Sequence, residues 1–131
     1  MKELIERLER ATEGSRGLDA RVGIAANGKM LRHPNVRGSW IWPHYTTSID
    51  AALTLVPEGW GAKITIPKGR SGAASVFDPS NGEEWGQNGL LQDRAGNRPD
   101  LIEFSRTFKH AATPALALCI AALKAREAEN A

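Results

Sequence analysis

The apolar residues of this chain recur with two periods, one typical of helices and one typical of strands. Apolar positions three and four residues apart, as at Leu4, Ile5 and Leu8, predict helices that bury one face. Strict alternation of apolar and polar residues, as from Trp60 to Ile66, predicts a half-buried strand. The expected elements, in chain order, are helices over residues 2–13, 18–26 and 47–56, strands over 60–66, 73–78 and 101–108, and a helix over 114–126.

Capping residues and prolines mark the ends of the later helices. Thr47 has a hydroxyl that can cap the third helix, and Pro57 ends it. Thr113 followed by Pro114 is a strong signal for the start of the last helix. That helix should lie in the centre of the core, because its apolar stripe consists of Leu116, Cys119, Ile120 and Leu123.

The resulting order α-α-α-β-β-β-α is typical of the α+β class, in which a sheet buries one face against helices. We expect one domain over residues 1–131, with a three-stranded antiparallel sheet and helices in a layered α/β/α sandwich. Its parts would be the amino-terminal helices (1–28), an aromatic and basic loop (29–45), and a core (46–128) that contains a long loop over 79–99.

Composition excludes several classes of protein. A chain of 131 residues, 41% of them hydrophobic and 24% charged, can bury a core without metals or disulfides. The single cysteine, Cys119, cannot form an internal disulfide, which favours a reducing, cytosolic setting. No apolar run reaches the roughly 18 residues of a membrane span, and the acidic start is unlike an export signal. We therefore expect neither a membrane protein nor a membrane partner.

Charge and candidate chemistry point away from catalysis. The formal net charge is only +2, but bases outnumber acids in residues 16–70 and acids outnumber bases in 71–105. This distribution indicates either a dipolar surface or ordinary solvated charge. No nucleophile motif is present, and the three histidines are scattered at His33, His44 and His110. We expect no enzymatic activity, no metal and no cofactor.

The turn after the first predicted strand is a candidate anion site. Lys68 and Arg70 lie in it beside Gly69 and Gly72, so backbone amides and two cations could converge on a phosphate. A basic, glycine-rich turn is also a common way to make a soluble hairpin. The sequence leaves both interpretations open.

A cluster of aromatic residues before the third helix is the second candidate. Trp40, Trp42 and Tyr45 could stack on a flat ligand, or they could anchor a long loop on a small core. If there is a ligand, we expect it in a groove between this cluster and the outer face of the sheet. The residues predicted to line that groove are Trp42, His44, Tyr45, Lys63, Lys68 and Arg70.

Two blocks of the sequence, residues 43–60 and 111–125, resemble the phage ABA sandwich domain, a family of small bacteriophage and prophage proteins. The family has no established activity, so the resemblance assigns no site residues. It implies a phage gene product in the cytoplasm of the bacterial host. On this basis we expect an accessory protein that binds and sequesters a small anionic, nucleotide-type host signal as a counter-defence factor.

Two alternatives use different partners. The chain could inhibit a host enzyme by binding it as a protein. It could also bind duplex RNA, since helix 47–56, three strands and the last helix follow the α-β-β-β-α order of double-stranded-RNA-binding domains. A single lysine, Lys109, near the start of the last helix disfavours RNA. A monomer or a small homo-oligomer is expected.

Overall fold

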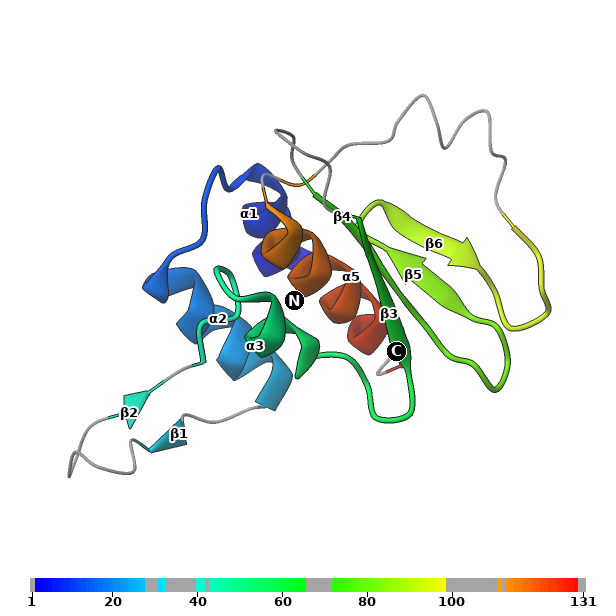
Figure 1. Cartoon of the computed structure of the whole chain (residues 1–131), viewed down its shortest axis with the longest axis horizontal. Coiled ribbons are helices and arrows are strands. Elements are labelled where there is room, and N and C mark those ends of the chain that lie inside the picture. The colour runs from blue at the N-terminus through cyan, green and yellow to red at the C-terminus, as the bar shows by residue number, and fades with distance from the viewer. Residues whose placement is uncertain are drawn as a thin grey trace.

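Helix α5, Pro114–Glu129, runs through the middle of the fold and carries most of the core (Figure 1). The Thr113 hydroxyl accepts the backbone N–H of Leu116 at 3.1 Å, as expected of a helix cap. Every side chain from Ala115 to Leu123 is at most 4% exposed. A helix that is apolar on all sides must be covered on all sides, so the prediction of a central core helix is confirmed.

The computed structural model describes residues 2–27, 31–32, 40–41, 43–65, 72–98, 111 and 113–129. Besides α5, these hold α1 (Lys2–Arg10), α2 (Arg16–Asn27), β1 (Leu31–Arg32), β2 (Trp40–Ile41), α3 (Ile49–Leu53), β3 (Gly61–Thr65), β4 (Ala73–Phe77), β5 (Glu84–Gly86) and β6 (Gly89–Gln92). No helix in this described part is long and apolar enough to cross a membrane.

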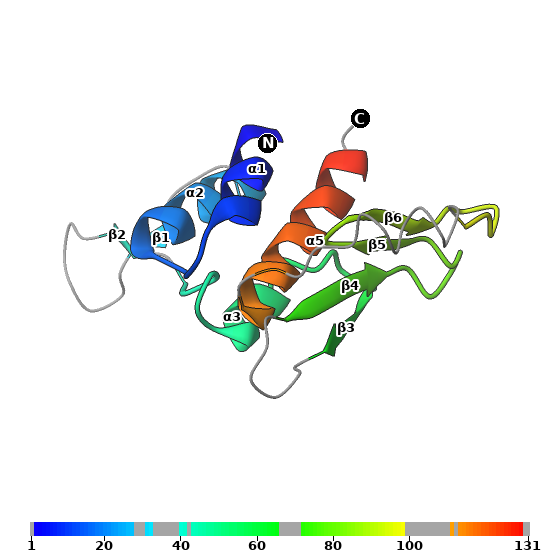
Figure 2. The same ribbon diagram turned by 90° about the horizontal axis from the view of Figure 1, so that it is seen from above.

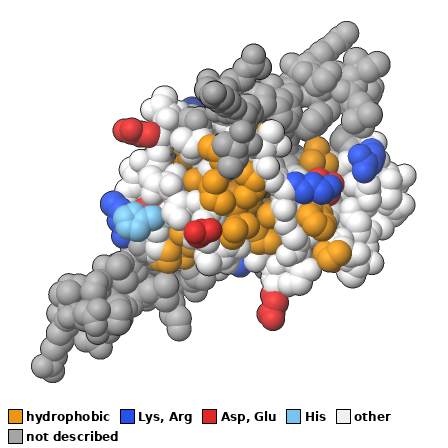
Figure 3. Space-filling view, viewed as in Figure 1, with side chains coloured by type: hydrophobic (Ala, Val, Ile, Leu, Met, Phe, Trp, Pro, Cys, Tyr) orange, Lys and Arg blue, Asp and Glu red, His pale blue; other side chains and the backbone are white. Residues whose placement is uncertain are grey.

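Helices α1, α2 and α3 cover one side of α5 (Figures 1 and 2). Helix α1 turns its three apolar residues inward, and Leu8 is only 1% exposed. Helix α3 begins after Ser48, whose Oγ accepts the N–H of Ala51, so the predicted cap at Thr47 is one residue early. Seen from the front, apolar side chains gather over α3 and α5 while charged side chains are scattered (Figure 3).

The antiparallel sheet β3-β4-β5-β6 covers the other side of α5 (Figure 2). Val76 is fully buried and stands opposite Ala62 on one side and Trp85 on the other, so these three residues share the face toward α5. The next position along the strands, where Lys63 pairs with Ser75, turns to the outer face.

The fold is α+β as predicted, but three details of the prediction are wrong. Strands β1 and β2 pair antiparallel inside the predicted loop 29–45. The sheet has four strands rather than three, because β5 and β6 form a hairpin inside the predicted loop 79–99. The described helices all lie on one side of the sheet, so the layers run helices, α5, sheet instead of α/β/α. The predicted strand over 101–108 lies outside the described residues.

Candidate functional site

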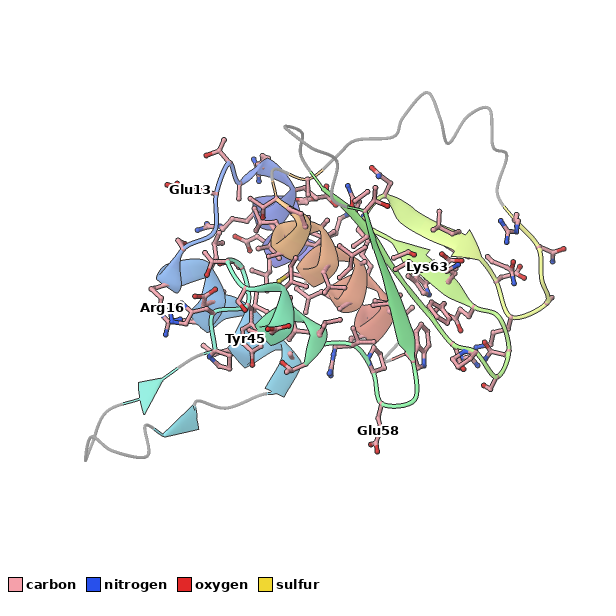
Figure 4. All side chains as sticks on the ribbon, viewed as in Figure 1. Glu13, Arg16, Tyr45, Glu58 and Lys63 are labelled. Atoms are coloured by element: carbon pink, nitrogen blue, oxygen red, sulfur yellow. The ribbon has the colours of Figure 1, made fainter. Side chains whose placement is uncertain are left out.

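The predicted groove between the aromatic cluster and the sheet does not form between the residues that the structure describes. Tyr45 and Lys63 lie on opposite sides of α5 (Figure 4). Tyr45 is 2% exposed, and its carbonyl oxygen accepts the thiol of Cys119 at 3.0 Å. Its ring is therefore core rather than a stacking surface. His44 is exposed, whereas Trp42, Lys68 and Arg70 lie outside the described residues.

Lys63 lies on the outer face of the sheet, as the alternation of strand residues predicts. Its ammonium is 3.7 Å from a carboxylate oxygen of Glu84 and 5.2 Å from the ring centre of Phe77. The other Glu84 oxygen accepts the hydroxyl of Ser75 at 2.8 Å. This carboxylate counters the lysine charge, which weakens Lys63 as an anion ligand.

The most buried polar cluster of the described chain has a structural role. Asp19 is fully buried, and one of its oxygens accepts both the backbone N–H of Thr46 at 2.8 Å and the Thr46 hydroxyl at 2.6 Å. Its second oxygen accepts a guanidinium N–H of Arg16 at 2.9 Å. The two bonds to Thr46 therefore join α2 to the segment that leads into α3, and the Arg16 bond lies within α2.

Cys119 lies next to this cluster and is unsuited to nucleophilic chemistry. Burial, together with the nearby charge of Asp19, raises the pKa of its thiol to about 12. A thiol with so high a pKa is almost never a thiolate at neutral pH. Among the described residues, no three His, Cys, Asp or Glu side chains converge as metal ligands do.

A groove beside the β5–β6 hairpin is the best candidate site. Its walls come from β5, β6, the turn that follows them and the end of α5, and it encloses about 610 Å³. We call it the Trp85 groove. The residues that line it are Glu83, Trp85, Leu90, Asp93, Arg94, Ala95 and Ala128.

One buried carboxylate holds the two largest side chains of the Trp85 groove. Glu83 is 7% exposed; its Oε1 accepts the indole N–H of Trp85, and its Oε2 accepts the Nε–H of Arg94, both at 2.8 Å. Burial acts to raise the pKa of Glu83, but the bonds from Arg94 and Trp85 outweigh it, so the pKa lies below its ordinary value. Glu83 is thus a charged anchor under an exposed guanidinium.

The turn after β6 fixes the rim of the Trp85 groove. A single carboxylate oxygen of Asp93 accepts the backbone N–H groups of Ala95 and Asn97, each at 2.9 Å. The positive φ of Gly96, +87°, lets the chain reverse there, a conformation that other residues rarely adopt. The rim is therefore built from local hydrogen bonds around Asp93.

Sequence patterns did not identify this groove, because its residues fall in the stretch predicted to be a loop. One signal for it was present. Asn88-Gly89 is a typical hairpin pair, and Trp85 and Leu90 flank it at positions that face each other in the ladder.

The comparisons with known proteins add no relative to this picture. No protein-family model matches the chain, and neither does any curated protein or solved structure.

Proposed function

We propose that this chain acts by binding another protein, and that the Trp85 groove receives a segment of that partner. The observation that carries the proposal is the shared anchor: Glu83 holds both Trp85 and Arg94 in place before any partner arrives. Side chains that are already ordered lose little conformational entropy on binding. A preorganised pair therefore favours association.

Residue type and shape support a protein partner. Tryptophan and arginine contribute more binding energy at protein interfaces than most other residues. Here Trp85 is half-buried and the Arg94 side chain is 69% exposed, so one offers a flat apolar wall and the other a charged rim. Sites that enclose small molecules are usually deeper clefts. A shallow groove is better matched to side chains presented by a protein surface.

The charges of the groove indicate the chemistry of the partner segment. Glu83 and Asp93 provide two carboxylates against the one guanidinium of Arg94, and the nearby Asp78 adds a further negative charge. The apolar part comes from Leu90 and Ala128. An apolar side chain next to a basic residue fits this combination. If the resemblance to phage proteins holds, the partner is a host protein that the chain inhibits.

A small anionic ligand fits this groove less well, since the carboxylates oppose an anion. It stays a prediction for the residues around Lys68 and Arg70. Calorimetry against a panel of cyclic and ADP-ribose-type nucleotides tests it directly. Heat at micromolar concentrations that is lost in Arg70→Ala would support an anion site at that turn and make it a second function.

The test of the proposed function compares two arginines of the same turn. Wild type, Arg94→Ala and Arg98→Ala serve as baits for proteins of a bacterial lysate, and circular dichroism confirms that each bait is folded. Arg98 is also exposed, but it bonds to Gln92 and does not line the groove. We expect a partner that wild type and Arg98→Ala retain and that Arg94→Ala recovers at least about tenfold less.

Equal recovery by all three baits would show that the partner binds elsewhere, and the proposal would be wrong. A retained partner is then mixed with wild type in purified form. Photo-crosslinking from position 95, on the groove rim, should join the two chains. Crosslinking from position 58, an exposed residue outside the groove, should not.

A further inference from the structure

We propose that a second copy of this chain docks on the hollow between α1 and α2. This α1–α2 hollow, of about 340 Å³, is lined by Glu3, Leu4, Arg21, Ile24 and Ala25. It shares no residue with the Trp85 groove, so the inference goes beyond the proposed function and stands apart from it.

The first observation is an exposed apolar side chain. Ile24 is 52% exposed, the largest value among the large hydrophobic residues of the described chain. Its neighbour Val22, on the inner face of α2, is fully buried, so the outer position is not needed for the core. Covering Ile24 with a second surface removes apolar area from water, which favours association.

The second observation is the pair of opposite charges that line the same hollow as Ile24. Glu3 on α1 and Arg21 on α2 are both exposed, and neither makes an ion pair with another described residue. A two-fold axis brings one patch onto the same patch of another copy. Glu3 then faces Arg21 of the partner subunit, and the same contact is formed a second time.

This charge pattern selects a second copy over other occupants. A partner with a uniformly acidic or basic surface meets one of the two charges with repulsion. The patch is complementary to itself, because it is lined by one acid, one base and the exposed apolar residue Ile24. Since α2 has 12 residues and is about 18 Å long, the interface is small and the dimer should dissociate on dilution.

Sedimentation velocity over a range of concentrations provides the measurement. Wild type should shift from monomer to dimer as its concentration rises. Ile24→Asp should remain monomeric. Leu53→Asp, at another exposed large hydrophobic residue of the described chain and outside the hollow, should dimerise as wild type does.

Charge reversal tests the pairing itself. Arg21→Glu alone places Glu3 against a glutamate of the other copy, and Glu3→Arg alone places two arginines together. Each should weaken dimerisation at least about tenfold, since two contacts per dimer become repulsive. An equimolar mixture of the two variants should recover the dimer, because each chain then meets its complement.

Three results would overturn the proposal. The first is a wild type that stays monomeric at every concentration, and the second is a dimer that survives Ile24→Asp. The third is a mixture of the two charge variants that stays monomeric. The proposed function is tested separately, because Arg94→Ala lies outside the hollow and should dimerise normally.

Discussion

At the scale of single residues, Asp19 organises the amino-terminal half of the chain. Its carboxylate binds the backbone and the hydroxyl of Thr46, and the same hydroxyl accepts the backbone N–H of Ser15 at 3.0 Å. Residues 14–15 and Thr46 approach so closely that a Cβ at Gly14 would lie 2.3 Å from the Thr46 carbonyl oxygen. A glycine is therefore required at position 14, and the buried polar groups of Thr46 require an acceptor, which Asp19 provides.

Replacing Asp19 tests this role. Asp19→Ala leaves the buried N–H of Thr46 without its acceptor and leaves the Thr46 hydroxyl only the Ser15 carbonyl oxygen, at 3.2 Å, so we expect the free energy of unfolding to fall by about 3 kcal/mol. Arg16→Ala removes a half-exposed partner from a fully buried carboxylate that keeps its bonds to Thr46, and it should cost less, about 1.5 kcal/mol. Urea denaturation followed by circular dichroism measures both. Equal losses would mean that the ion pair, and not the bonds to Thr46, matters most.

At the scale of elements, the helices could be predicted from sequence and the β5–β6 hairpin could not. Helix α5 has a cap, a proline at its first position and an apolar stripe, and these signals agree. Strands β5 and β6 have only three and four residues and include Gly86 and Gly89. Such short segments in a stretch rich in glycine, asparagine and aspartate give no clear period of two.

The candidate site was missed for a related reason. Glu83 and Glu84 are adjacent acids, and in a loop both would be solvated. Glu84 is the first residue of β5 and Glu83 directly precedes it, and neighbouring side chains along a strand point to opposite faces. Glu83 therefore reaches Trp85 and Arg94, while Glu84 reaches Ser75 on the outer face.

The sequence identified Tyr45 as a candidate ligand-binding residue by its aromatic type, but only the packing against α5 shows that its ring is part of the core.

The contact between α1 and α5 gives a prediction at this scale. Leu8 is 1% exposed within the core, so Leu8→Ala should lower the free energy of unfolding by about 3 kcal/mol through lost contacts and the cavity left behind. Glu9→Ala, the next residue, removes a half-exposed ion pair with Lys124 and should cost less than about 1 kcal/mol. Thermal unfolding compares them. A Leu8 variant as stable as wild type would show that α1 is not part of the core.

At the scale of the whole molecule, the carboxyl half of α5 links the helical side to the sheet. The Lys124 ammonium pairs with Glu9 of α1 at 3.0 Å and donates to the backbone carbonyl of Gln87, in the β5–β6 turn, at 2.6 Å. One turn of helix further on, Ala128 lines the Trp85 groove. Because α5 lies between the helices α1–α3 and the sheet, it fixes the position of the Trp85 groove relative to α1.

Among the described residues, the groups with lowered pKa values lie at one end of the sheet, around the Trp85 groove. The Ser80 hydroxyl and backbone N–H lower the pKa of Asp78. The backbone N–H of Asn97 does the same for Asp93. Glu83 is lowered because the bonds from Arg94 and Trp85 outweigh burial. Protonation of these three carboxyl groups at acid pH should therefore weaken this end of the molecule.

The pH dependence of stability follows from these directions. A carboxyl group whose pKa is lower in the folded state stabilises the fold above its ordinary pKa, and that contribution is lost as the pH falls. For Glu83 the ordinary value is 4.5, so we expect the free energy of unfolding to decrease as the pH falls below it. The indole N–H resonance of Trp85 should shift over the same range, as its acceptor becomes protonated. In Glu83→Gln, which cannot ionise, both changes should shrink; an unchanged profile would place the acid sensitivity elsewhere.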